Sequence, residues 1–303
     1  MGIGGKSLDS QQPSDYARNI QQFLDEDVDL VVTFGPGLAL DTASAARAHP
    51  DRKFAIVNYA FPDCRDGMLE GRDCGSAAEL SNVRGLIFQI DAAAFLAGYL
   101  AAGMTKTGKV GTYGSVNAPA VTVIMNAFEQ GVSYYNNVHG TAIEVKGGLS
   151  QASGGLFTGN NDSTDDGRAY ALALILEGVD IIMPVAGATG RGSAAVCKET
   201  GQCLVIGVET DWYVSAPEYR EIVLTSLRKR IDIAVYDTIQ DAMQGKFTGG
   251  TVVYTIMDGA VDLAPFHDLD ESVPDSLKSE IESLRELLSE GALTVNGNPG
   301  GGQ

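Results

Sequence analysis

The chain has 303 residues, 44% hydrophobic side chains and a formal net charge of −18. This length accommodates one large or two modest α/β domains, and the negative charge argues against nucleic-acid binding because polyanions would be repelled. The longest apolar run, 92–104, is interrupted by Gly98 and Gly103 and is too short to span a membrane, so it predicts a packed helix.

Helical and extended patterns alternate along the chain, which predicts parallel sheets with right-handed crossovers. The expected helices cover 13–24, 39–48, 91–104, 119–135, 164–176, 193–199, 231–243 and 276–288. The expected strands cover 29–34, 53–58, 83–89, 109–113, 142–146, 180–185, 204–208, 223–226 and 251–256.

A fresh strand at 108–111, after a long helix, predicts a second sheet, and the turn near Ser226 predicts a return of the chain. We therefore expect an α/β fold of two lobes, each a doubly wound parallel sheet, with a cleft between them. The expected first lobe is 1–107 with 228–248 and 275–292. The expected second lobe is 108–227 with 249–274, followed by a disordered tail, 293–303.

The segment 180–195 is the most informative stretch. Five consecutive apolar residues, 181–185, predict a strand that is buried on both faces. Gly187, Gly190 and Gly192 then remove side chains at a turn before a helix, where small ligands bind in open α/β sheets. The alternative is a tight turn without a ligand. The segment lacks the Gly-Lys-Ser/Thr of a phosphate loop and the spacing of a dinucleotide fingerprint.

The four cysteines form two local pairs. Cys64 and Cys74 flank a polar excursion, whereas Cys197 and Cys203 flank a helix end and the start of a strand. This arrangement fits two short-loop disulfides formed in an oxidising compartment, and the alternative is four unrelated thiols. No histidine lies near either pair, which argues against a zinc site.

Several segments together resemble the basic membrane protein family, the solute-binding lipoproteins of ABC importers that include the purine nucleoside receptors of spirochaetes. They keep the family's order between about residues 13 and 292, and they are Phe95-Leu-Ala-Gly-Tyr-Leu-Ala-Ala, Lys106-Thr-Gly-Lys-Val-Gly, Ala186-Gly-Ala-Thr-Gly-Arg-Gly, Ile206-Gly-Val-Glu-Thr-Asp, Leu224-Thr-Ser-Leu-Arg-Lys-Arg-Ile-Asp, Gly249-Gly-Thr-Val-Val and Leu263-Ala-Pro-Phe.

The resemblance implies a type I periplasmic-binding-protein-like fold and an extracytoplasmic, membrane-anchored monomer. Such a protein binds a purine nucleoside or similar small solute between its lobes and presents it to ABC permease subunits, without a cofactor. The family begins with a strand and a Gly-x-x-Asp-Asp-x-Ser-Phe-Asn segment that this sequence does not show. Because that segment lines one side of the ligand site, we expect the chain as written to bind weakly or not at all. Residues 1–6 also show neither a signal peptide nor a lipid-anchor cysteine.

A nucleoside needs carboxylates for its ribose hydroxyls and aromatic faces for its base. Asp211 aligns with the family's ribose-binding aspartate, with a solvated loop carboxylate as the alternative. Lys229 aligns with a family lysine that reaches the ligand, with an exposed basic residue as the alternative. Asp91 is expected to accept from a base N–H, to cap a helix, or both. Trp212 offers either a stacking surface or ordinary packing.

Weaker candidates complete the expected site. Gly35, Gly37, Gly187 and Gly190 would let backbone approach the ligand, or would only satisfy turn geometry, and Phe157 would form an aromatic wall. Asn117 and Asn160 lie in loops after strands, where turn residues are common.

Two other functions compete with this one. A nucleotide-cofactor-dependent α/β enzyme is the first alternative, but the first strand–turn–helix lacks the dinucleotide fingerprint. His49, His139 and His267 also show no patterned Ser, Cys or Asp partner. The second alternative is a truncated relic that binds nothing.

Overall fold

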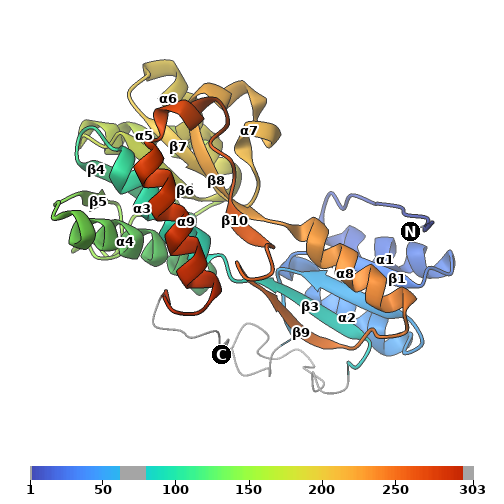
Figure 1. Ribbon diagram of the computed structural model, residues 1–303. Coiled ribbons are helices and arrows are strands. Elements are labelled where there is room, and N and C mark those ends of the chain that lie inside the picture. The colour runs from blue at the N-terminus through green and yellow to red at the C-terminus, as the bar shows by residue number, and fades with distance from the viewer. Residues whose placement is uncertain (1, 62–79, 296–303) are drawn as a thin grey trace. The chain divides into compact units, whose positions relative to one another are not determined.

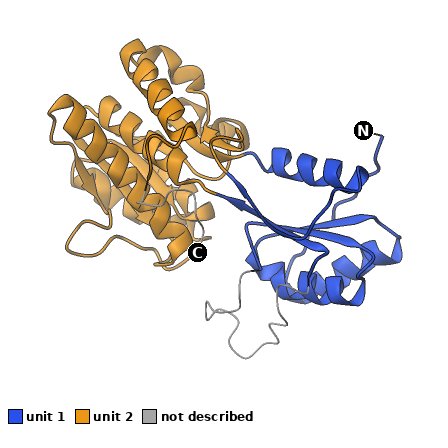
Figure 2. Ribbon diagram, turned by 60° about the horizontal axis from the view of Figure 1, so that its bottom comes forward, with its two compact units in different colours: residues 1–88, 230–254 blue, residues 89–229, 255–303 orange. Residues whose placement is uncertain are grey.

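The computed structural model describes residues 2–61 and 80–295 (Figure 1). The chain divides into two compact units (Figure 2). Unit 1 comprises residues 1–88 and 230–254, and unit 2 comprises residues 89–229 and 255–303. The chain therefore passes between the units three times, and each unit has its own sheet, as the sequence predicts. Cys64 and Cys74, and the tail from 296 onward, lie outside the described residues.

Unit 1 is built on a parallel sheet of order β1-β2-β3-β9. Its strands are β1 (Leu30–Phe34), β2 (Lys53–Val57), β3 (Val83–Phe88) and β9 (Gly250–Tyr254), and its helices are α1 (Tyr16–Asp25), α2 (Ala39–Ala48) and α8 (Ile231–Met243). Short 3-10 turns precede α1 and α2, at Pro13–Asp15 (η1) and Pro36–Leu38 (η2). Ile20, Val31 and Phe54 are among the side chains that fill its core.

Unit 2 has a larger sheet of order β10-β8-β7-β6-β4-β5, parallel except for β10. Its strands are β4 (Lys109–Gly114), β5 (Glu144–Lys146), β6 (Ile181–Val185), β7 (Leu204–Gly207), β8 (Val223–Lys229) and β10 (Val261–Leu263). Its helices are α3 (Asp91–Met104), α4 (Pro119–His139), α5 (Thr164–Leu176), α6 (Gly190–Thr200), α7 (Trp212–Ser215) and α9 (Asp275–Ser289), with 3-10 turns η4 (Gly187–Thr189), η5 (Pro217–Ile222) and η6 (His267–Ser272).

The units divide the chain differently from the expected lobes. Strand β9, expected in the second lobe, pairs with β3 in unit 1. Arg84 of β3, which is 4% exposed, links this strand to α8 and to the residues just before β9. It donates to the Thr248 carbonyl at 3.1 Å and pairs with Asp241 at 2.7 Å. A buried arginine needs such partners, so β9 and α8 stay with β3.

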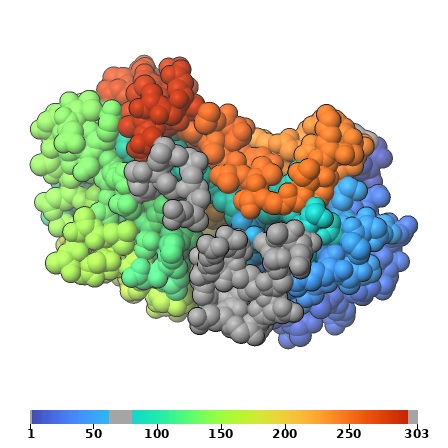
Figure 3. Space-filling model, turned by 90° about the horizontal axis from the view of Figure 1, so that it is seen from below, coloured from blue at the N-terminus to red at the C-terminus, as the bar shows by residue number. Residues whose placement is uncertain are grey.

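Helices α3 and α9, both expected in the first lobe, belong to unit 2. Helix α9 lies at the surface of this unit (Figure 3) and buries one apolar face, Leu277, Ile281, Leu284 and Leu288. Leu277 fills the space beside Gly103 of α3. The spacing of these four apolar residues predicts an amphipathic helix, but not the unit that it covers.

Two glycines set the close approach of α3 and α4. A Cβ atom at Gly98 would overlap the Phe128 carbonyl oxygen, and one at Gly131 would overlap the Phe95 carbonyl oxygen. The backbones touch at both points. Helix α3 is buried along nearly its whole length, as expected for a helix whose apolar residues surround it rather than forming one stripe. None of the helices in the described part of the chain is long and apolar enough to span a membrane.

Cys197 and Cys203 form a disulfide, as expected for that pair. It joins the last turn of α6 to the residue before β7, and both sulfur-bearing side chains are buried. The bond therefore fixes where β7 begins in the sheet of unit 2.

We expect Gly98→Ala to destabilise the protein by about 1–3 kcal/mol, because the added methyl overlaps backbone that cannot turn aside. A loss of stability would be diagnostic of this close packing, because Gly→Ala inside a helix ordinarily stabilises a protein by about 0.5–1 kcal/mol. Urea unfolding of the variant measures the change. Gly5→Ala, at an exposed position with open space around it, is the control and should leave the midpoint unchanged. A Gly98→Ala protein as stable as the wild type would contradict the packing described.

Removing the disulfide should lower the free energy of unfolding by about 2–4 kcal/mol. The test uses a Cys64→Ser/Cys74→Ser background, in which Cys197 and Cys203 are the remaining cysteines. Chemical denaturation with and without reductant gives the difference, and Cys197→Ala/Cys203→Ala should match the reduced protein. Two freely titratable thiols in the oxidised, denatured background protein would disprove the bond.

Candidate functional site

The candidate site lies at the carboxyl edge of the unit 2 sheet, where β7 and β8 end side by side. These strands pair in parallel, with Gly207 opposite Ser226, and a register shift follows Val205. The segment 208–211 leaves β7 at the edge where β8 reaches Lys229. Parallel pairing thus brings together the loops that carry the two strongest sequence candidates, Asp211 and Lys229.

Lys229 is held in place by Glu209, a residue that the sequence analysis did not select. The Lys229 amide donates to the Glu209 carbonyl at 3.0 Å, and its ammonium lies 2.7 Å from Glu209 Oε1. The Lys229 side chain is only 11% exposed, whereas that of Glu209 is 45% exposed. Lys229 is therefore not a solvated basic residue. The signal that could have found Glu209 was an acidic residue directly after the expected strand 204–208.

Asp211 caps the short helix α7 and is largely buried. Its Oδ1 accepts from the Tyr213 amide at 3.1 Å, and its Oδ2 lies 2.9 Å from Nε2 of His267. The carboxylate is 14% exposed, so it is not a solvated loop residue. His267 was expected to lack a patterned partner. The structure supplies Asp211, because η6 follows β10, which pairs with β8.

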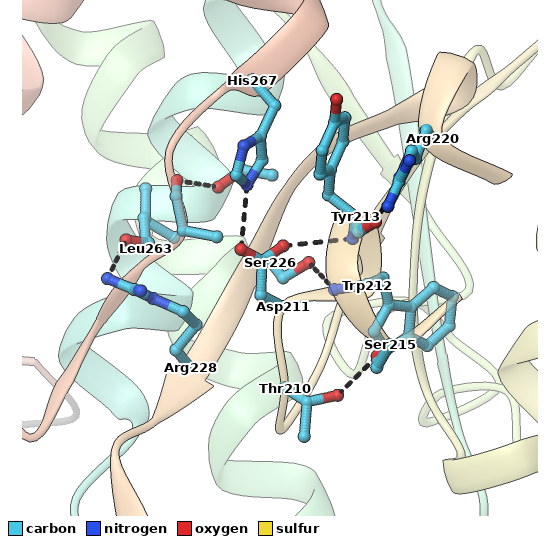
Figure 4. Close-up of polar contacts among 12 residues, drawn as sticks. Thr210, Asp211, Trp212, Tyr213, Ser215, Arg220, Ser226, Arg228, Leu263 and His267 are labelled. Atoms are coloured by element: carbon cyan, nitrogen blue, oxygen red, sulfur yellow. Dashed lines mark hydrogen bonds and ion pairs between the residues drawn. The ribbon is translucent and has the colours of Figure 1, made fainter. Parts of the chain in front are cut away.

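Three flat side chains stack beside Asp211 (Figure 4). The rings of Tyr213 and His267 are 3.9 Å apart and nearly parallel, at 11°. The Arg220 guanidinium lies 4.8 Å from the Tyr213 ring centroid. The Tyr213 hydroxyl donates to Asp268 at 2.9 Å, and this bond raises the pKa of the phenol.

Trp212 lies in the core, as the packing alternative predicts. The residue is 3% exposed, its indole N–H donates to the Val208 carbonyl at 3.2 Å, and its amide donates to Ser226 Oγ at 3.0 Å. Arg191 covers the ring at 4.1 Å, and burial lowers the pKa of that guanidinium. The indole fixes the base of segment 208–211 rather than offering an open stacking surface.

The four candidate glycines have different surroundings. A Cβ atom at Gly190 would press on Pro184 and Trp212, so packing explains this glycine. Gly187 has a φ of 56° and serves the turn into η4. Gly35, with a φ of 91°, has open space around it at the end of β1 in unit 1, while Gly37 lies beside the Tyr16 ring.

Phe157 and Asn117 both lie near the carboxyl end of β4, at the same edge of the unit 2 sheet. Phe157 bridges to Gly114 at the end of β4, and its ring occupies the space that a Gly114 side chain would need. Asn117 is exposed in the loop after β4. Asn160 instead has a local structural role, because its side chain donates to Asp166 at 2.7 Å and accepts from Ser163 and Thr189.

Asp91 is the first residue of α3, and Ile90 occupies the N-cap, so the expected N-cap role of Asp91 is wrong. The residue is 6% exposed, and Oδ1 accepts from the adjacent Ala92 amide at 3.0 Å. A carboxylate in the first turn still stabilises the helix through its dipole. The described residues contain no cluster of His, Cys, Asp and Glu suited to a metal ion.

These observations define the class of the protein. Two parallel-sheet units linked by three crossings, with charged and aromatic groups at strand ends, are typical of binding proteins for small solutes. Residues 2–297 match the family model of ABC transporter substrate-binding proteins that are PnrA-like. The chain belongs to this family, whose activity is solute binding for an ABC transporter rather than catalysis.

Relatives and solved structures agree with this assignment. The chain is 28% identical to a CD4+ T-cell-stimulating antigen of Listeria monocytogenes, over 98% of this chain and 78% of the relative. It is 26% identical to the ABC transporter nucleoside-binding protein BmpA of Lactococcus lactis, with coverage of 97% and 78%. An ABC transporter solute-binding protein from Aeropyrum pernix K1 superposes with a TM-score of 0.71 at 21% identity, covering 94% of this chain and 82% of that one. The fold is thus the type I periplasmic-binding-protein-like fold.

We expect Asp211→Ala to lower the free energy of unfolding by about 0.5–2 kcal/mol, because α7 loses its N-cap acceptor. Asp211→Asn keeps a side-chain oxygen for the Tyr213 amide and should lose less. Urea denaturation followed by circular dichroism measures both. Equal, wild-type stability of the two variants would show that the cap does not stabilise this segment.

Proposed function

We propose that this ABC transporter substrate-binding protein binds a purine nucleoside or a similar small neutral solute and presents it to permease subunits. The observation that carries the proposal is the pairing of β7 with β8, which puts Asp211 and Lys229 at one edge of the unit 2 sheet. These are the two residues that the resemblance to the family places at ligand-contacting positions. The nucleoside-binding relative from Lactococcus lactis supports the same solute class.

The hydrogen-bonding capacity of the edge suits a diol. An ionised carboxylate offers about four lone pairs. Within Asp211, the described contacts occupy one direction on each oxygen, from the Tyr213 amide and from His267. The remaining directions can accept the two vicinal hydroxyls of a ribose. In this proposal Glu209 keeps Lys229 oriented, and the ammonium donates to a solute oxygen.

The aromatic and amide candidates have a different part in the proposal. Phe157 lies at the end of β4 with its ring partly exposed, so it provides a face for a base, and Asn117 follows the same strand with an exposed side chain. Asp91 would accept from a base N–H. Gly35 and Gly187 would allow close backbone approach.

We also propose an extracytoplasmic location, with membrane attachment as in the basic membrane proteins that the chain resembles. The buried Cys197–Cys203 disulfide supports this location, since such bonds persist in oxidising compartments. A monomeric state remains a prediction.

Asp211→Ala should weaken nucleoside binding roughly ten- to a hundredfold, because charge-assisted hydrogen bonds in a desolvated site contribute about 1.5–3 kcal/mol each. Isothermal titration calorimetry with inosine, guanosine and adenosine provides the measurement. Lys229→Gln should weaken binding in the same range.

Glu199→Gln is the matched control, since this exposed carboxylate of α6 pairs with Arg168 and belongs to no part of the candidate site. It should bind as the wild type does. Wild-type affinity in both Asp211→Ala and Lys229→Gln would place the solute elsewhere. A wild-type protein that binds a sugar or amino acid but no nucleoside would refute the proposed solute class.

A further inference from the structure

We propose that His267 is a positioning residue: it fixes the carboxylate of Asp211 and, through it, the whole segment 208–211 that the candidate site needs. The part concerning affinity rests on the proposed function. The part concerning the segment stands on the geometry alone. His267 itself need not contact the solute for either part.

The first support is a closed set of contacts between two segments more than 50 residues apart in the sequence. His267 Nε2 lies 2.9 Å from Asp211, and Asp211 accepts from the Tyr213 amide at 3.1 Å. The Tyr213 hydroxyl returns to Asp268, the neighbour of His267, at 2.9 Å. The His267 and Tyr213 rings stack between these bonds. Rotation of any one of these side chains therefore breaks contacts made by the others.

The chemistry of the bond assigns its direction. Asp211 is an acceptor, so Nε2 of His267 carries the proton and donates. A donor aimed at Oδ2 limits rotation of the carboxylate, whereas the Tyr213 amide alone restrains only Oδ1. The outward lone pairs of Asp211 consequently keep one direction, which is the requirement for recognising two hydroxyls at a fixed spacing.

Backbone geometry supplies a second, independent observation. His267 has a φ of 48° and Glu209 a φ of 76°, both in the left-handed region that non-glycine residues seldom adopt. Such a conformation is unfavourable for a non-glycine residue and persists only where its surroundings over-determine it. One of these two residues, Glu209, thus lies on the strand-end segment two positions before Asp211, and the other, His267, lies on η6 and contacts Asp211 directly.

The contacts of Trp212 make the segment observable without a ligand. Trp212 is the single tryptophan of the chain and lies between Asp211 and Tyr213 in sequence. Its indole bonds to Val208 and its amide bonds to Ser226, at the base of the same segment. Loosening of Asp211 should therefore change the emission of this one fluorophore.

The experiment compares His267→Phe with His267→Gln in the full chain. Both replacements bear the cost of the left-handed φ, but Phe keeps a flat ring for the stack and has no donor, whereas Gln keeps a donor. We expect His267→Phe to shift the Trp212 emission and raise its quenching by acrylamide, with far-UV circular dichroism unchanged. His267→Gln should restore both signals toward the wild type.

In calorimetric titrations with inosine, His267→Phe should weaken binding about tenfold, which corresponds to about 1.4 kcal/mol, and His267→Gln should recover most of that loss. His49→Phe, the same chemical change at the end of α2 in unit 1, is the control and should alter neither signal. Tyr213→Phe keeps the ring and loses only the bond to Asp268, so it tests the contact set if the His267 variants fold poorly. It should raise quenching less than His267→Phe does.

The proposal would be overturned if His267→Phe kept the Trp212 emission and quenching of the wild type. Where the His267 variants do not fold, the same result in Tyr213→Phe would overturn it. A folded His267→Gln that behaves like His267→Phe would also overturn it, because the donor would then not matter. If the wild-type protein binds no nucleoside, the proposed function fails, while the fluorescence comparison still decides whether His267 positions the segment.

Discussion

The parallel pairing of β7 with β8 is the constraint on which the candidate site depends. Two strands that run the same way end at the same edge, so residues about 20 positions apart meet there without any contact being specified by sequence proximity. The amide of Lys229 reaches the carbonyl of Glu209 because of this register, and the ion pair between their side chains follows from it. A shift of one residue would reverse the faces of the strand and remove the pair.

Unit 2 holds that register from both ends. The Cys197–Cys203 bond fastens the residue before β7, and Trp212 and Asp211 fasten the residues after it. Between these anchors β7 is only four residues long, Leu204–Gly207, and it pairs with β6 on one side and with β8 on the other. The covalent bond, the buried indole and the capped helix therefore serve one purpose, which is to hold a short strand beside β8.

The sequence predicts the local parts of this arrangement well and the non-local parts poorly. Apolar runs such as 181–185 predict their strands because burial on both faces leaves a signature in consecutive residues. Strand β9 was assigned to the wrong unit, since its pairing with β3 spans more than 150 residues. His267 was missed for the same reason. Its partner is set by β10 on β8, and no spacing pattern in the sequence encodes that.

At single residues, the choice between a packing role and an exposed role depends on how buried the side chain is, and the sequence does not reveal that burial. Trp212 carries both an apolar surface and a polar N–H, so its sequence position fits packing and stacking equally. The 3% exposure and the covering Arg191 settle it as packing. Asp211 and Glu209 follow the same strand and have the same charge. Asp211 nevertheless caps α7 and contacts His267, whereas Glu209 pairs with Lys229.

This difference bears on the charge that the proposed solute can carry. The edge holds three carboxylates, Glu209, Asp211 and Asp268, together with the cations Lys229, Arg220 and Arg228. Because these charges nearly balance, hydrogen bonding has to supply most of the recognition there, and a neutral solute with paired hydroxyls suits the lone pairs of Asp211. The net charge of −18 on the whole chain adds a long-range repulsion of phosphorylated ligands. Together these charges favour a nucleoside over a nucleotide and so support the narrower solute class proposed.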